Sequence, residues 1–153
     1  MTLCLRNRQR DCLIDLRLLR RVLLFALERL FRVPDYELCF HFVPASEMAS
    51  VNEKFLNHIG PTDVITFDHS DCGRNLHGEI FICPEVAIRQ AREFRTSWQL
   101  EVVRYCVHGL LHLRGHDDVR AVKRRKMKHE EDRLVKEVAQ QFAVARLSRA
   151  RLK

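Results

Sequence analysis

Three histidines and two aspartates fall within the segment VHGLLHLRGHDD, residues 107 to 118. His108 and His112 are four residues apart, and an α-helix turns about 100° per residue, so both side chains lie on one helix face. Two neutral imidazoles placed in this way can bind a single metal ion. The leucines between and after them predict that the helix is buried, which would hold the two ligands rigidly. The segment therefore predicts a metal site at the end of a buried helix.

A third ligand is expected just beyond Gly115, a residue that can adopt a left-handed conformation, end the helix and turn the chain back. A catalytic zinc site needs three protein ligands and one open position. In sites with the spacing H-x-x-x-H-x-x-G-x-x-ligand, the third ligand corresponds to Asp118. A carboxylate is an acceptable zinc ligand. The spacing favours Asp118, and His116 remains the alternative.

The residue after the first histidine narrows the chemistry. Zinc proteases with an H-E-x-x-H helix use the glutamate at that position as general base. Here the position is Gly109. Peptide hydrolysis is therefore disfavoured, although a metallopeptidase with its base elsewhere remains a third candidate function.

The rest of the chain predicts the elements that position this segment. Periodicity, capping residues and turn residues indicate helices at 15–31, at 46–55 with Ser46 as N-cap, at 84–94 beginning at Pro84, and at 119–143. A further long helix follows a cap at Thr96 or Ser97 and reaches Leu113. Strands are indicated at 36–43, 63–67 and 77–83. Strands interspersed with helices indicate one sheet covered by helices. We expect a single α/β (α+β) domain over residues 1–153. It would hold a small mixed sheet of about four strands and about five helices, with a basic tail from about residue 144.

Charge and cysteine usage bear on partners and location. The 153 residues carry a formal net charge of +7, which favours polyanions such as nucleic acid. Basic residues follow the metal turn at Arg120, Lys123, Arg124, Arg125, Lys126 and Lys128, and recur in the tail at Arg146, Arg149, Arg151 and Lys153. Six cysteines without a C-x-x-C pair, and charged residues that interrupt the first apolar run, predict reduced thiols in the cytoplasm. No segment is long and apolar enough to predict a membrane partner.

Several blocks together resemble the YbeY family of metal-dependent endoribonucleases. They are HGLLHLRGHDD at 108–118, Asn52 followed by PTDVITF at 61–67, GEIFIC at 78–83, and Met127 with Glu131. The blocks occur in the order of the family and cover about residues 36 to 135. Two positions differ from the family pattern. Asp118 stands where the family has its third metal-binding histidine, and Leu56 matches the position of an arginine thought to meet RNA phosphate.

The resemblance implies a single-strand-specific endoribonuclease that acts in 16S rRNA 3′-end maturation and ribosome quality control. Its partners would be an rRNA precursor and the small ribosomal subunit. It would use one divalent transition metal and no organic cofactor; zinc is expected first, and nickel, iron and manganese also suit these ligands. His58, Asp63 and Asp117 are candidates for proton transfer or for orienting the metal ligands. The alternative is a ribosome-assembly factor whose metal is mainly structural, favoured by the changed ligand and by Leu56.

Overall fold

The computed structural model describes residues 1–71 and 73–148. The strands are β1 (Thr2–Asn7), β2 (Tyr36–Phe42), β3 (Val64–Asp68) and β4 (Leu76–Ile82). The helices are α1 (Leu16–Phe25), continued by the π-helical turn η1 (Ala26–Leu30), α2 (Ala45–Leu56), α3 (Pro84–Phe94), α4 (Trp98–Leu113), α5 (Ala121–Gln141) and the short 3-10 helix η2 (Val144–Leu147). Within these residues, no helix has the length and apolar character needed to cross a bilayer.

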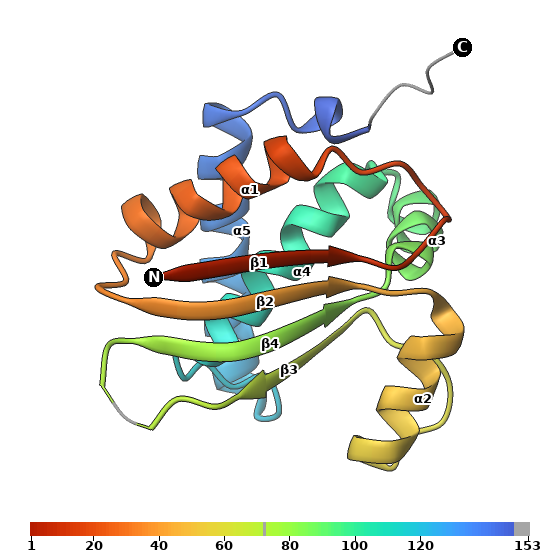
Figure 1. Cartoon of the computed structure of the whole chain (residues 1–153), viewed down its shortest axis with the longest axis horizontal. Helices are drawn as coiled ribbons and strands as arrows, with labels where there is room; N and C mark the ends of the chain where they lie inside the picture. The colour runs from red at the N-terminus through yellow and green to blue at the C-terminus, as the bar shows by residue number, and fades with distance from the viewer. Residues whose placement is uncertain (72, 149–153) are drawn as a thin grey trace.

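The four strands form one mixed sheet in the order β1-β2-β4-β3 (Figure 1). β1, β2 and β4 run parallel, and β3 pairs antiparallel with β4 at the other edge. This confirms the expected small mixed sheet of four strands with five α-helices. The helices follow the predicted order along the chain.

Alternation along the strands divides the sheet into two different faces. On one face, Leu38, Phe40 and Ile80 join the larger core, to which α1, α4 and α5 contribute their apolar sides. On the other face, α2 covers one end of the sheet through a smaller core that includes Met48 and Ile65. The remainder of that face is turned toward the viewer in Figure 1, and no helix of the described chain crosses in front of it.

Local signals account for the helices nearest the predicted metal site. α3 begins at Pro84, whose fixed φ and missing N–H suit the first helical position. α4 begins after Ser97, whose side chain accepts a hydrogen bond from the Leu100 amide at 3.2 Å. α4 ends at Leu113, and Gly115 follows with φ of 93°. Both predicted helix ranges are therefore confirmed.

Other expectations differ from the structure. Ser46 is not an N-cap, because α2 begins one residue earlier with Pro44 at the cap position and no side-chain cap. β1 was missed because its short sequence TLCLRN becomes a strand only through pairing with β2. At the other end of the chain, residues 144–148 are packed: Leu147 is fully buried, its carbonyl accepts from the Asp15 amide at 2.8 Å, and Ser148 bridges to Ile14.

Candidate metal centre

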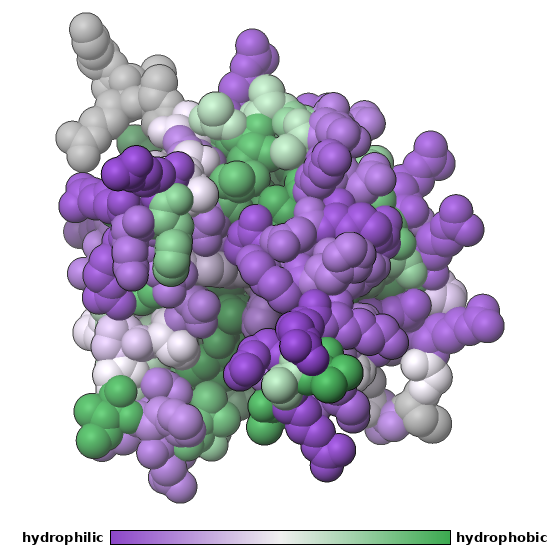
Figure 2. All heavy atoms as spheres, turned by 180° about the vertical axis from the view of Figure 1, so that it is seen from behind, coloured by the Kyte–Doolittle hydropathy of each residue, from purple (hydrophilic) through white to green (hydrophobic). Residues whose placement is uncertain are grey.

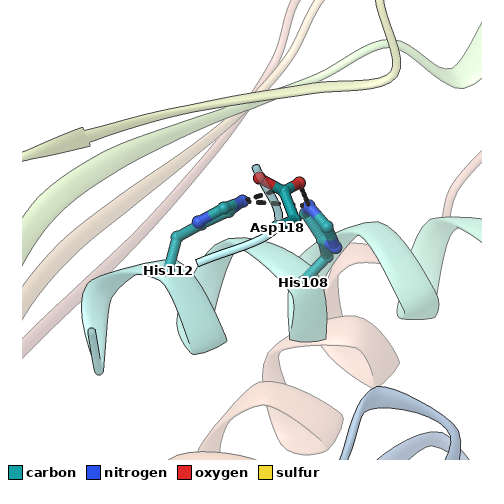
Figure 3. A group of neighbouring side chains, drawn as sticks. All are labelled: His108, His112 and Asp118. Carbon is teal, nitrogen blue, oxygen red and sulfur yellow. Dashed lines mark hydrogen bonds and ion pairs between the residues drawn. The ribbon is translucent and has the colours of Figure 1, made fainter. Parts of the chain in front are cut away.

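Three side chains from one helix and the turn after it converge on a single point. His108 and His112 project from the same face of α4, and Asp118 lies over them from the following turn (Figure 3). The two Nε2 atoms are 3.1 Å apart, and Asp118 Oδ2 lies 3.4 Å from His108 Nε2 and 3.5 Å from His112 Nε2. Among the described residues, these three form the one group of side chains close enough together to hold a metal ion.

The spacing of these atoms suits a tetrahedral metal. Zinc bonds to nitrogen and oxygen are about 2.0–2.2 Å long, so two ligand atoms of a tetrahedral site lie roughly 3.4 Å apart. The three measured distances lie close to that value. Two imidazoles and one carboxylate also leave one of four positions for a substrate atom or water. The residues present therefore fit a zinc-type site with one open position.

The far nitrogen of each imidazole contacts an acceptor. His108 Nδ1 donates to Glu131 Oε1 at 2.9 Å, and His112 Nδ1 donates to the His116 carbonyl at 3.1 Å. With the proton held at Nδ1, each Nε2 presents its lone pair toward the other ligands. The arrangement therefore fixes both the tautomer and the ring orientation that metal binding requires.

Glu131 also sets the electrostatics of the site. Burial disfavours the charged form of His108, but the hydrogen bond and charge of Glu131 outweigh it, so the pKa of His108 is raised. Burial likewise opposes ionisation of Glu131, yet His108, Lys128 and Arg104 together lower its pKa. The buried carboxylate is thus held ionised, and negative charge behind the His108 ring favours a cation in front of it.

Gly109 lies where α4 presses most closely on the sheet. A Cβ atom at this position would lie 2.8 Å from Ile80 Cγ2 on β4, so even a methyl group would clash. A glutamate there has no room and would point into the sheet rather than toward the metal ligands. The close packing thus explains why position 109 is a glycine. It also leaves no place there for the glutamate that an H-E-x-x-H protease uses as general base.

A cavity of about 620 Å³ opens beside the ligands. Its lining includes the candidate ligands His108 and Asp118, and also Asp63, Tyr105, Phe94, Arg124 and Lys128. Phe94 is 64% exposed, which is unusual for an aromatic side chain of this size. The cavity therefore combines two of the three candidate metal ligands with further carboxylates, an accessible aromatic ring and three cationic side chains, those of Arg104, Arg124 and Lys128.

The other predicted site residues differ in their positions. Asp63 lines the cavity, but its Oδ1 also accepts from the Val64 amide at 2.8 Å, which caps the entrance to β3. Asp117 Oδ1 accepts from the Val119 amide at 2.8 Å and shapes the turn before α5. His58 is exposed in the loop after α2 and is not part of the cavity lining. The His116 side chain is outside the ligand group, and only its carbonyl contacts a ligand.

The predicted basic residues lie on the exposed side of the first half of α5. Lys123, Arg124, Arg125 and Lys126 are all exposed, and Figure 2 shows hydrophilic side chains over most of the side on which α4 and α5 lie. Lys128 is partly neutralised, with Nζ 3.3 Å from Glu131 and 3.1 Å from Asp132. Arg149, Arg151 and Lys153 of the predicted tail lie outside the described residues.

Sequence reasoning assigned no role to Glu131 and Arg104. The Glu131 side chain is 7% exposed and contacts both His108 and Arg104, whose Nη1 lies 3.1 Å from Glu131 and 2.6 Å from Asp132. One signal could have indicated Glu131: it follows Met127 by four residues, and Leu134 and Val135 share the same buried helix side. A carboxylate within an apolar helix face needs a buried partner.

Comparisons with known proteins show which proteins this chain resembles. The family model described as "Endoribonuclease YbeY" matches residues 5–139. The Endoribonuclease YbeY of Cutibacterium acnes is 37% identical over 120 residues, covering 72% of this chain and 77% of that protein. The Endoribonuclease YbeY of Finegoldia magna is 32% identical over 144 residues, covering 90% and 94%.

A solved structure shows the same fold. The solution structure of TM1509 from Thermotoga maritima matches with a TM-score of 0.69, covering 98% of this chain and 97% of that one. The sequence identity is 24%, so the likeness concerns the fold alone. The overall fold described above is thus shared with an independently solved structure.

Proposed function

Because this chain belongs to the YbeY endoribonuclease family, we propose that it is a metal-dependent endoribonuclease acting on single-stranded segments of ribosomal RNA precursors. The proposal includes 16S rRNA 3′-end maturation and ribosome quality control as its setting, with the small ribosomal subunit as partner. The observation that carries it is the convergence of His108, His112 and Asp118 beside a cavity that also holds cations. Metal-dependent phosphodiester cleavage uses a bound cation at the reacting phosphate and positive charge for the rest of the backbone.

We assign His108, His112 and Asp118 as the ligands of one divalent ion, with zinc as the favoured metal. When bound, such an ion supplies a Lewis acid that polarises a phosphoryl oxygen and lowers the pKa of a water molecule. Glu131 holds the proton at His108 Nδ1, and the His116 carbonyl holds the one at His112 Nδ1. The chain's own groups thereby keep both ligand nitrogens aimed at one point.

Other cavity residues suit the remaining tasks. Asp63 presents a carboxylate into the cavity and is the candidate for proton transfer. Arg124 and Lys128 provide positive charge for backbone phosphates. Phe94 offers an exposed ring on which an unpaired base can stack, which favours single-stranded substrate. In this proposal Asp117 has a supporting part, because it shapes the turn that carries Asp118.

The alternative is a ribosome-assembly factor with a mainly structural metal. The specific observation in its favour is Leu56, which matches the family's arginine and is 45% exposed at the end of α2. An apolar side chain there provides no guanidinium for phosphate. Under this alternative the protein binds rRNA and metal without cleaving.

Cleavage of a structured rRNA precursor with and without chelator separates the two functions. An enzyme should lose cleavage with chelator, regain it on addition of zinc, and lose it in His112→Ala. His129→Ala is the matched control, because it removes an exposed histidine of α5 that is not in the ligand group. RNA binding without cleavage at several metals would favour the assembly factor, and cleavage that persists in His112→Ala would overturn the proposed site.

A further inference from the structure

Two cysteines lie side by side on the open face of the sheet, away from the metal ligands. Cys4 on β1 and Cys39 on β2 are register partners in the parallel pair. Both side chains are half-buried, both thiols are free, and both line a hollow of about 270 Å³ on this face. Solvent and small molecules can therefore reach them together.

The surroundings of the two thiols shift their pKa values in opposite directions. Cys39 and the Arg6 guanidinium lie beside the Cys4 thiol, and both lower the pKa of Cys4. Burial raises the pKa of Cys39 to about 12. A thiolate, rather than a thiol, is the nucleophile in cysteine chemistry. Cys4 is thus suited to react first, with a second thiol next to it.

A metal site explains this cluster less well. His41, which also lines this hollow, uses both ring nitrogens: Nδ1 lies 3.1 Å from Arg8 Nη1 and Nε2 lies 3.0 Å from Glu79. No group of three ligand atoms converges here among the described residues. A guanidinium beside the Cys4 sulfur also repels a cation. The cluster is therefore better explained as a pair of reactive thiols than as a metal site.

We propose that Cys4 and Cys39 form a peroxide-sensitive thiol pair that closes reversibly into a disulfide between β1 and β2. The Cys4 thiolate attacks a peroxide oxygen, the O–O bond breaks, and Cys4 sulfenic acid and hydroxide form; the hydroxide takes up a proton to become water. Cys39 sulfur then attacks Cys4 sulfur and loses its proton, the S–O bond breaks, and a second water leaves. Two thiols are oxidised, and one hydrogen peroxide is reduced to two waters.

The strand geometry permits this bond and makes it labile. Neighbouring strands lie about 4.7–4.9 Å apart, within the Cα separation of about 4.4–6.8 Å found for disulfides. The Cβ atoms of a disulfide are closer, about 3.8 Å, so the strands must approach each other. β1 is an edge strand and pairs only with β2, so it can shift. Strained, exposed disulfides are the readily reduced ones.

The test is peptide mapping of the full chain after brief treatment with hydrogen peroxide and alkylation of remaining thiols. Trypsin should yield a peptide joining residues 1–6 to residues 33–54, with a loss of two hydrogens, in the wild type and in Cys72→Ser. Glutathione should restore both separate peptides. Cys12 is the internal control, because burial raises its pKa to about 12. Cys4 should react at least about tenfold faster than Cys12.

Variants separate the role of Cys4, which reacts with peroxide, from that of Cys39, which closes the disulfide. In Cys39→Ser, a sulfenic-acid probe should label Cys4, because no second thiol is present to close the bond. In Cys4→Ser, neither label nor cross-link should form, and Arg6→Gln should slow the loss of the Cys4 thiol. The wild-type mapping stands even if a variant misfolds. Cross-links that involve other cysteines first, or equal rates at Cys4 and Cys12, would overturn the proposal.

Discussion

At His108, the direction of the metal-facing nitrogen depends on a contact on the opposite side of the ring. Glu131 comes from a different helix, is almost fully buried, and accepts from His108 Nδ1 at 2.9 Å. Such carboxylates orient a histidine ligand and make it more basic. Glu131 therefore belongs to the proposed metal centre although it does not contact the metal position.

Replacing Glu131 with glutamine tests this part. The amide oxygen can still accept from Nδ1, but the negative charge is lost, so we expect zinc affinity to fall by about 10- to 100-fold. Competition against a chromophoric chelator measures the affinity. Asp132→Asn is the control, since Asp132 also pairs with Arg104 and Lys128 but is not among the hydrogen-bonding partners of His108. Equal zinc affinity in both variants would contradict the assignment.

A second test on single residues asks whether Asp118 or His116 is the third metal ligand. Asp118→Ala should lower bound zinc well below one per chain, because two imidazoles alone hold the ion weakly. His116→Ala should leave the stoichiometry unchanged, because only the backbone carbonyl of His116 contacts a ligand. Elemental analysis of the two variants beside the wild type decides the point. Zinc lost only in His116→Ala would reverse the assignment.

Residues differ in how much of their role the sequence can indicate. The common face of His108 and His112 follows from helix geometry alone, and Gly115 marks the turn that carries Asp118. The helix pattern can indicate that Glu131 is buried, but its contact with His108 depends on how α5 packs against α4, which the local sequence does not encode. The exposed position of His58 likewise depends on the path of the loop after α2.

Among the elements, α4 must be positioned most precisely. It holds two ligands, packs on β3 and β4, and presents Gly109 to Ile80 at a distance that admits no side chain. A change in its start or end would move both imidazoles. Its N-cap, Ser97, is therefore worth testing.

Ser97→Ala should destabilise the protein by about 0.5–2 kcal/mol, because the Leu100 amide loses its acceptor. Urea unfolding monitored by circular dichroism measures the change. Ser46→Ala provides the matched control: this exposed serine is near the start of α2 but does not cap it, so its effect should stay within about 0.5 kcal/mol. Similar losses in the two variants would show that the cap is not what stabilises α4.

Helices that begin at a proline or a capping serine were predictable from the sequence, and a strand that depends on pairing with another strand was not. Pro84 and Ser97 fix the starts of α3 and α4 through local chemistry. β1 has no such marker, and its conformation depends on the partner strand. Ser46 has the right chemistry for a cap, but Pro44 precedes it and starts the helix earlier.

For the molecule as a whole, the effect of the net charge of +7 on RNA binding depends on where the basic residues lie. Arg124 lines the cavity beside the metal ligands, whereas Arg29 is exposed on η1 and is not part of that lining. A phosphate contact should depend on position, while general attraction to RNA should depend only on total charge. The two arginines separate these effects.

Arg124→Gln should weaken single-stranded RNA binding and lower the slope of log affinity against log salt by about 1. Arg29→Gln removes the same charge and should leave the slope nearly unchanged. Fluorescence anisotropy over a series of salt concentrations measures both. If the variants lose affinity equally, the cavity does not bind the phosphate backbone.

The contact between residues 14–15 and 147–148 has a consequence for how the protein is made. Translation delivers the start of α1 long before the segment that holds it, so these backbone bonds cannot form on a nascent chain that stops earlier. The ribosome must extend the chain at least to residues 147–148 before these contacts can form. Translation products that stop before this segment would lack the contacts at the start of α1 and would be more prone to proteolysis.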